Sequence, residues 1–181
     1  MNNNILISFG HTKEEPGACN GEYCEYDFTK LWAEVIVDNL TEEFDDNIIL
    51  VPEGSLQQKV NFINENDPLF CIEIHFNSNV NAEGSESLYY PESEEGQWIA
   101  DRIQDKYEEW NIFQPNRGVK EGVYWKDGEI AGTLYLLKTT VCPTVIVESE
   151  FIFNSDKILH QQDEGIKALS EVIKEIYDEL D

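Results

Sequence analysis

The sequence is poor in basic residues and has no long apolar run. Its 181 residues include 12 Lys and Arg against 37 Asp and Glu, which gives a formal net charge of −25. This charge repels phosphate groups, so we expect neither nucleic acid nor an anionic membrane as a partner. No stretch reaches the roughly 18 apolar residues of a membrane span, and the first residues lack the basic segment of a secretory signal. We therefore expect synthesis in the cytoplasm and no membrane insertion.

Cysteine is also scarce. Four Cys are too few for a disulfide scaffold in a chain of this length, and the cytoplasm keeps thiols reduced. We therefore expect Cys71 and Cys142 to pack as small apolar side chains. Cys19 and Cys24 have four residues between them, which only weakly indicates a structural metal because no second pair accompanies them.

The composition predicts a chain that folds as one unit. Hydrophobic residues make up 41% and aromatic residues 12%, well above the level of a disordered acidic tail. The length suits one domain, and no repeat or linker divides the chain. We predict a single domain spanning residues 1–181, and we expect it to be a monomer.

Short apolar runs alternate with longer amphipathic stretches, which is typical of helices covering a mostly parallel sheet. We predict an α/β fold with a twisted, mostly parallel sheet of about five or six strands, flanked by helices on both faces. The predicted strands are residues 5–9, 47–51, 69–76, 87–90 at a sheet edge, and 144–148, with a hairpin near 125–130. The predicted helices are residues 25–40, 56–63, 97–110 and 132–140, and a last helix with Ser155 as its N-cap.

Three residues of ligand or base type lie at the ends of predicted strands. His11 follows the first strand, His75 lies near the end of the third, and Glu148 ends the last. Ligands gather outside the carboxyl ends of parallel strands, so we expect one shared site. Two imidazoles and one carboxylate are a common ligand set of catalytic zinc. The loop after His11 offers four candidate carboxylates, among which spacing does not choose: Glu14, Glu15, Glu22 and Glu25.

The residues around His11 are similar to a known motif. The run G-H-x5-G-A-x2-G-x3-E at positions 10–25 resembles the opening motif of the zinc-dependent N-acetylmuramoyl-L-alanine amidases. Later segments agree in order: L-Q-Q-K-V-N-F-I-N at 56–64, I-H-F-N-S at 74–78, G-S-E-S-L-Y-Y at 84–90, R-G-V-K at 117–120, L-Y-L-L-K-T-T-V-C-P-T-V-I-V-E at 134–148 and F-I-F-N at 151–154. The resemblance therefore covers essentially the whole chain.

The resemblance implies a site and a reaction. One Zn²⁺ per chain would be bound by His11, Glu25 and His75, and Glu148 would be the catalytic base. The bond cleaved would be the amide between N-acetylmuramic acid and the first L-Ala of the stem peptide in peptidoglycan. Three polar residues are expected to contact this substrate, namely Asn77, Arg117 and Lys120. For the two cations, ordinary salt bridging with neighbouring acids is an equal alternative.

The sequence departs from the family's usual residues at five positions, none of them a predicted ligand or base: Thr12, Asn20, Lys59, Glu73 and Glu150. We expect the last two to add negative charge near the metal.

A single amidase domain without an export signal resembles a phage endolysin, which acts on the cell wall of the infected host. The alternatives are a zinc peptidase or an amidase acting on soluble muropeptides, and a non-catalytic wall-binding relative. Tyr124 and Trp125 are expected either to stack on sugar or to belong to the core. His160 is expected to be a surface or helix-packing residue of the last helix.

Overall fold

The computed structural model describes residues 3–44 and 47–180. The ends of the predicted domain, residues 1 and 181, therefore lie outside the described residues. Six strands form one sheet in the order β4-β1-β5-β10-β6-β7. The four strands β4 (Ile48–Leu50), β1 (Ile5–Phe9), β5 (Phe70–Asn77) and β10 (Thr144–Phe151) run parallel. The last two, β6 (Ser85–Tyr89) and β7 (Asn116–Glu121), run the opposite way.

The predicted fold class is confirmed, with two corrections at one side of the sheet. β6 is not an edge strand, because β7 pairs with its outer side. The sequence pattern of β7 does not predict a strand. Its residues, N-R-G-V-K-E, are mostly polar and only partly buried, so they lack the apolar run that marks the inner strands.

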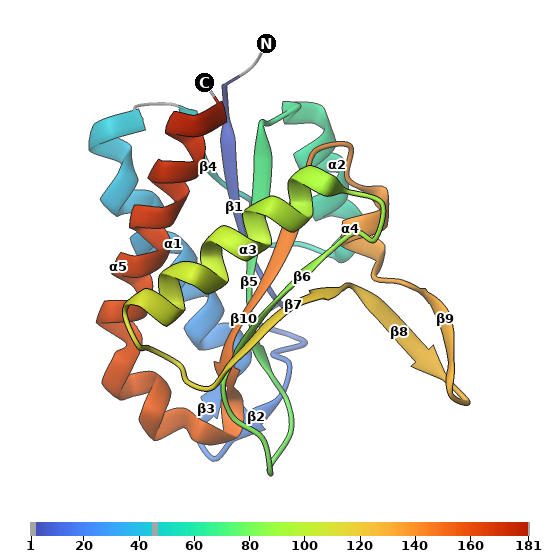
Figure 1. Cartoon of the computed structure of the whole chain (residues 1–181), viewed down its shortest axis with the longest axis vertical. Helices are drawn as coiled ribbons and strands as arrows, with labels where there is room; N and C mark the ends of the chain where they lie inside the picture. Colours follow the sequence, from blue (N-terminus) through green and yellow to red (C-terminus); the bar gives the residue numbers. More distant parts are fainter. Residues whose placement is uncertain (1–2, 45–46, 181) are drawn as a thin grey trace.

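Helices cover both faces of the sheet, as predicted (Figure 1). The larger core lies under α1 (Glu25–Phe44), α3 (Glu94–Glu109) and α5 (Ser155–Leu180). The smaller core lies under α2 (Leu56–Asn66) and the short α4 (Tyr135–Thr139). Among residues 3–44 and 47–180, no helix is both long and apolar enough to cross a membrane.

The start of α5 differs from the prediction. A 3₁₀ turn, η2 (Ile152–Asn154), runs directly into the helix, and Ser155 has helical backbone angles of φ −52° and ψ −35°. Ser155 therefore does not cap the helix. Its hydroxyl instead accepts a hydrogen bond of 3.1 Å from the amide of Asn20, which ties the start of α5 to the loop after β1. His160, farther along α5, is exposed as expected.

Two hairpins lie outside the main sheet. The predicted hairpin is present as β8 (Val123–Lys126) and β9 (Glu129–Thr133), and it projects from the domain (Figure 1). Tyr124 and Trp125 are 51% and 65% exposed, so they are not part of the core. The second hairpin, β2 (Cys19–Asn20) and β3 (Tyr23–Cys24), lies between β1 and α1.

The second hairpin also overturns an expectation. Cys19 and Cys24 form a disulfide, so they are neither reduced nor available as metal ligands. The physical reason is the antiparallel pairing of β2 with β3, which places Cys19 directly opposite Cys24. Cys71 is a buried thiol as predicted, whereas Cys142 is only partly buried.

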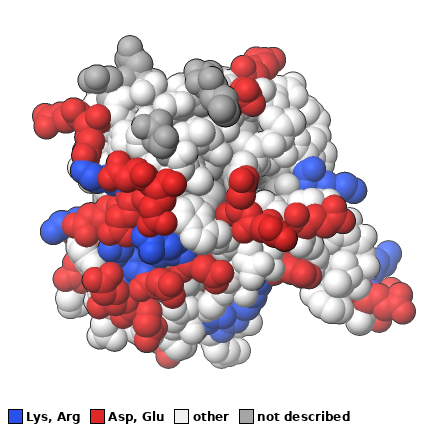
Figure 2. Space-filling view, turned by 45° about the horizontal axis from the view of Figure 1, so that its top comes forward, with Lys and Arg blue, Asp and Glu red and all other residues white. Residues whose placement is uncertain are grey.

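Acidic side chains dominate the surface. Figure 2 shows basic side chains in small groups that lie among acidic ones. On α3, for example, Arg102 and Lys106 form ion pairs with Glu175 on the neighbouring α5, and Arg102 also pairs with Glu179. Most of the cations are thus already neutralised by local partners, which leaves the net charge negative.

Candidate metal and catalytic site

The loop after β1 brings His11 beside His75. Gly10 extends the pairing of β1 with β5 by donating its backbone N–H to the carbonyl of Ile74 at 2.9 Å. A Cβ atom at position 10 would lie 2.4 Å from Cε1 of His75, so only glycine leaves room for that imidazole. His11 itself has a left-handed backbone with φ 66°. The rings of His11 and His75 lie edge to face, with centroids 5.2 Å apart.

Glu25 is the carboxylate that joins the two histidines. It is the first residue of α1 and is buried. Its Oε2 lies 2.9 Å from Nε2 of His11, and its Oε1 lies 2.9 Å from Nδ1 of His75. Its Oε1 also accepts a hydrogen bond from the backbone N–H of Phe76 at 3.1 Å. The other three carboxylates of the loop, Glu14, Glu15 and Glu22, are exposed, so only Glu25 forms the cluster.

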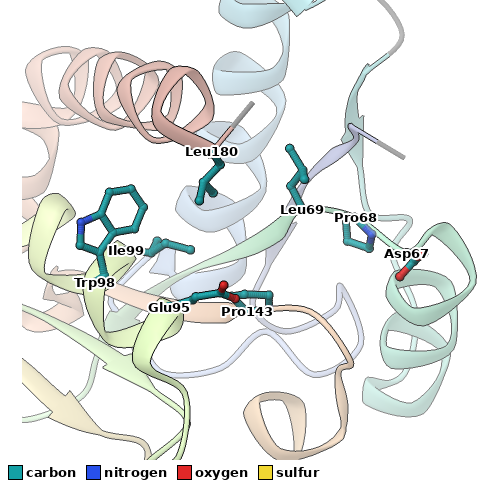
Figure 3. A pocket seen from close by; sticks show the side chains of 8 residues that line it. All are labelled: Asp67, Pro68, Leu69, Glu95, Trp98, Ile99, Pro143 and Leu180. Atoms are coloured by element: carbon teal, nitrogen blue, oxygen red, sulfur yellow. The ribbon is translucent and has the colours of Figure 1, made fainter. Parts of the chain in front are cut away.

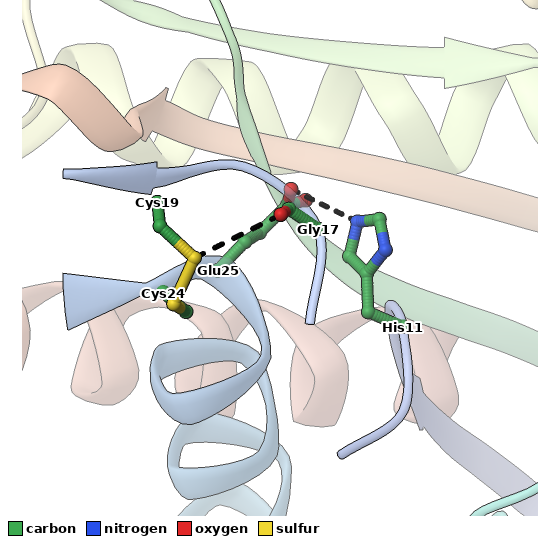
Figure 4. The surroundings of a disulfide bond; sticks show 5 residues. All are labelled: His11, Gly17, Cys19, Cys24 and Glu25. Carbon is green, nitrogen blue, oxygen red and sulfur yellow. Dashed lines mark hydrogen bonds and ion pairs between the residues drawn. A yellow bond between two sulfur atoms is a disulfide. The ribbon is translucent and has the colours of Figure 1, made fainter. Parts of the chain in front are cut away.

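Gly17 packs against His11 and Glu25. Figure 4 shows this contact next to the Cys19–Cys24 disulfide of the β2–β3 hairpin. Gly17 has φ 76°, and a Cβ atom there would lie 2.6 Å from Nε2 of His11 and 2.7 Å from Oε2 of Glu25. The loop backbone therefore approaches the two side chains more closely than any other residue would permit.

The side chains of His11, Glu25 and His75, here called the His–Glu–His cluster, fit a zinc ion. One nitrogen or oxygen atom from each lies within 4.8 Å of the others. Two imidazoles and a carboxylate are zinc ligands of the catalytic kind, which leave a position for water. The side chains of His11 and His75 are 30% and 19% exposed, so solvent reaches the cluster.

The charges in the cluster stabilise one another. Burial by itself would raise the pKa of Glu25, but hydrogen bonds and charge from His11 and His75 lower it to about 2. Burial would likewise lower the pKa of His75, but hydrogen bonds to Glu25 and Glu73 raise it well above its ordinary value. Without metal, a proton on the ring of His75 therefore takes the place of a cation beside Glu25.

Glu148 lies beside the cluster. It pairs with His75 in the parallel ladder of β10 and β5. Its Oε2 is buried and has no hydrogen-bond partner among the described residues. Burial is the main reason why the pKa of Glu148 is raised to about 7. The prediction that this residue ends its strand is wrong, because β10 continues to Phe151 after an irregularity in the register.

Glu86, which the sequence pattern does not single out, binds all three residues predicted to contact the substrate. Glu86 accepts hydrogen bonds from Asn77 at 2.9 Å, from Arg117 at 2.6 Å and from Lys120. It also pairs with Glu148 across β6 and β10. Arg117 and Lys120 thus form salt bridges with a neighbouring acid, which was the alternative to substrate binding. Nothing in the local sequence marks Glu86, because its partners lie on β5 and β7.

The two additional glutamates differ in their surroundings. Glu73 contacts the cluster directly, with Oε1 at 3.0 Å from Nε2 of His75. Glu150 is instead engaged by Lys157 at 2.6 Å and by Asn154 at 3.0 Å. The charge of Lys157 compensates that of Glu150, so only Glu73 adds a carboxylate to the contacts of the cluster.

A cleft of about 280 Å³ opens beside the cluster. It lies between the loop after β1 and the start of α2, and its lining includes His11, His75 and Leu56. Another pocket, shown in Figure 3, is lined by Leu69, just before β5, and by Pro143, just before β10. That pocket lies at the amino ends of the strands, opposite the His–Glu–His cluster, and is no part of the candidate site.

Together, these features define the class of protein: an α/β domain with a two-histidine, one-carboxylate cluster and an adjacent buried glutamate at the carboxyl ends of parallel strands. A sequence profile of N-acetylmuramoyl-L-alanine amidase matches residues 5–177. The chain belongs to this family, whose members act on peptidoglycan.

Solved structures agree with this assignment. An N-acetylmuramoyl-L-alanine amidase from Clostridium difficile 630 has a TM-score of 0.80 at 17% identity, with 98% of each chain covered. The amidase AmiC2 of Nostoc punctiforme has a TM-score of 0.79 at 20% identity, with 97% of each chain covered. The catalytic domain of the CD27L endolysin targeting Clostridia difficile is 30% identical, with a TM-score of 0.72 and 96% of each chain covered. Curated protein sequences yield no match.

Proposed function

We propose that this chain is a zinc-dependent amidase that hydrolyses the bond between N-acetylmuramic acid and L-Ala in peptidoglycan. The observation that carries the proposal is the position of Glu25. Its two oxygens each lie 2.9 Å from a nitrogen of a different histidine, and Glu148 lies next to one of those histidines in the sheet.

His11, Glu25 and His75 would hold one Zn²⁺ per chain. Zinc at this place supplies a Lewis acid for the amide carbonyl and activates water at neutral pH. Two hydrogen bonds hold the buried Glu25. Its carboxylate accepts one from the backbone N–H of Phe76, and its own backbone N–H donates one of 2.9 Å to the carbonyl of Ala18. These contacts orient the carboxylate before a metal binds.

Glu148 would move the proton. Its Oε2 lacks a hydrogen-bond partner among the described residues and is therefore free to accept a proton from the attacking water. The same carboxyl group would then donate that proton to the departing nitrogen of L-Ala. A pKa raised to about 7 suits both steps, because the group gains and loses a proton at little cost near neutral pH.

Asn77, Arg117 and Lys120 would hold the stem peptide. Two cations share the single carboxylate of Glu86, which leaves one positive charge in excess beside Glu148. The side chains of Arg117 and Lys120 are partly exposed, and Arg117 also lies 5.1 Å from the ring centre of Phe151. An excess cation at this place would attract the carboxylates of a stem peptide in an otherwise acidic protein.

The proposed biological role is that of an endolysin: a monomeric single catalytic domain, 1–181, made in the cytoplasm of an infected cell and acting on its wall. The similarity to the catalytic domain of the CD27L endolysin supports this role. The net charge of −25 supports the absence of nucleic acid and anionic membrane among its partners.

Digestion of purified sacculi tests the proposal. The zinc-loaded protein is expected to release stem peptides that begin with L-Ala, as identified by mass spectrometry, and a chelator should abolish their release. Glu148→Gln should abolish it as well. Glu150→Gln is a matched control, because it changes a buried glutamate of the same strand that is paired with Lys157.

The products separate the proposal from its rivals. Cleavage within the stem peptide would identify a peptidase. Release from soluble muropeptides but not from sacculi would identify an amidase of soluble fragments. Intact substrates despite one bound zinc per chain would identify a non-catalytic relative.

A further inference from the structure

Glu73 makes a contact that the reaction proposed above does not use. It lies two residues before His75 on the same face of β5 and is only 4% exposed. Its Oε1 lies 3.0 Å from Nε2 of His75, while Nδ1 of the same ring lies 2.9 Å from Glu25. The imidazole is therefore held between two carboxylates, one on the metal side and one behind it.

A buried network holds Glu73 in this position. The hydroxyl of Ser8 on β1 donates a hydrogen bond of 2.7 Å to Oε2. The ammonium group of Lys59 on α2 lies 3.7 Å from the same oxygen. Lys59 is also buried, donates to the backbone carbonyl of Phe9 and lies 4.9 Å from the ring centre of that residue. One carboxylate oxygen is thus anchored by two elements, and the other is left for His75.

This arrangement decides which ring nitrogen faces the metal. An ionised carboxylate accepts hydrogen bonds and donates none, so Nε2 of His75 must carry a hydrogen where it meets Glu73. A neutral imidazole has only one N–H, so Nδ1 then carries the lone pair. Nδ1 is the nitrogen that faces Glu25 and the rest of the His–Glu–His cluster.

We propose that Glu73 is a positioning residue that keeps His75 in the tautomer protonated on Nε2 and so presents Nδ1 to the zinc. Ser8 and Lys59 keep Glu73 in place. The inference rests on the zinc site of the proposed function and deepens it. A carboxylate behind a ligand histidine also raises the basicity of the ring, and loss of such a partner typically weakens metal binding about 10–100-fold.

Zinc affinity, measured by competition with a chromophoric chelator, tests the role of Glu73. Glu73→Ala is expected to weaken binding about 10–100-fold. Glu73→Gln keeps the size of the side chain and a carbonyl acceptor, so it should recover part of the affinity. Glu150→Gln is the matched control. It alters another buried glutamate that is paired with a lysine, and its affinity should equal that of the wild type.

Glu73→Ala leaves the buried ammonium group of Lys59 without its carboxylate partner, and this could destabilise the fold. A second variant separates that effect from the effect on zinc binding. The double variant Glu73→Ala with Lys59→Met removes both charges of the pair. It should fold and still bind zinc about 10–100-fold more weakly than the wild type.

Nitrogen NMR of the histidine rings gives a readout that a purely structural role would not change. The chain has three histidines, and His160 is assigned by its own substitution. In the zinc-loaded wild type, His75 should carry its proton on Nε2. In Glu73→Ala without metal, Nε2 loses its acceptor and only Glu25 remains beside the ring, so the hydrogen should no longer be held on Nε2.

The outcomes are distinguishable. A wild-type protein that binds no zinc would contradict the proposed function itself. A wild type that binds zinc, with Glu73→Ala and the double variant within about twofold of it, would overturn the role of Glu73 alone. A zinc-loaded His75 protonated on Nδ1 would overturn it as well.

Discussion

Glu148 lies directly beside His75, because β10 and β5 pair in parallel with these two residues in register. On its other side, Glu148 pairs with Glu86 of β6. One row across three strands therefore holds an imidazole, a carboxylate whose Oε2 has no hydrogen-bond partner in the described part of the chain, and a carboxylate that binds two cations. The register of the sheet thus places the groups proposed for metal binding, proton transfer and substrate binding next to one another.

Glu148→Gln separates proton transfer from metal binding. Glutamine has the same shape but does not accept the proton, so kcat/KM should fall about 10²–10⁴-fold. The zinc content should stay at one ion per chain, because Glu148 is not part of the His–Glu–His cluster. Amide cleavage of soluble muropeptides and metal analysis of the same sample measure the two quantities. Loss of zinc together with activity would contradict the assignment of Glu148 as the base.

Glu148 should also make the stability of the metal-free protein depend on pH. Its pKa is about 7 in the folded chain against an ordinary value of 4.5, so the folded state binds this proton more tightly. The resulting stabilisation is fully present below pH 4.5 and is lost as the pH rises through about 7. The difference amounts to about 3 kcal/mol of unfolding free energy at most.

Urea unfolding with chelator at pH 5 and pH 8 measures this effect. The wild type should lose unfolding free energy from pH 5 to pH 8 as Glu148 loses its proton. Glu148→Gln has no proton to lose at this position, so its unfolding free energy should rise relative to that of the wild type from pH 5 to pH 8. An equal change in both proteins would show that Glu148 does not titrate in this range.

Gly17→Ala should damage the cluster itself. The added Cβ would lie 2.6 Å from Nε2 of His11 and 2.7 Å from Oε2 of Glu25. Gly21→Ala is the control, because Gly21 also has a positive φ, 65°, but nothing lies within 4 Å of its Cβ position. Each change should cost about 1–2 kcal/mol of stability for the left-handed backbone. Only Gly17→Ala should also weaken zinc binding, by about tenfold or more, as measured by chelator competition.

The disulfide next to Glu25 should contribute to both stability and metal binding. Cys19 and Cys24 close a loop of six residues, for which the chain-entropy estimate is about 2 kcal/mol. Cys19→Ser with Cys24→Ser should therefore lower the melting temperature by about 4–8 °C. Zinc affinity should fall too, since Glu25 directly follows Cys24 and is tied through its N–H to Ala18.

A thiol reductant should reproduce this loss in the wild type and leave the double serine variant unchanged. Cys142→Ser is the control, because Cys142 is a free, partly buried thiol. A wild type whose melting temperature does not respond to the reductant would contradict the role of the disulfide.

The inner strands and the main helices could be predicted because their signal is local. β1 and the first part of β10 are mostly apolar runs in which nearly every residue is buried, which is what a parallel strand covered on both faces requires. β7 could not be predicted, because its polar residues become a strand only when β6 offers a free edge. The disulfide was missed for a similar reason, since it depends on a hairpin that pairs Cys19 with Cys24.

For the candidate site, the sequence by itself determined the types of residue and their order along the chain. Histidines after strands, a nearby carboxylate and a glutamate on the last strand are visible without a structure. Spacing left Glu14, Glu15, Glu22 and Glu25 open and the family resemblance pointed to Glu25; the tertiary structure places Glu25 between the two histidines. It also decided that Glu73 stands behind His75 and that Glu86 binds both cations. The physical reason is that these contacts join residues on different strands and helices, so their distances depend on strand register and helix packing rather than on spacing in the sequence.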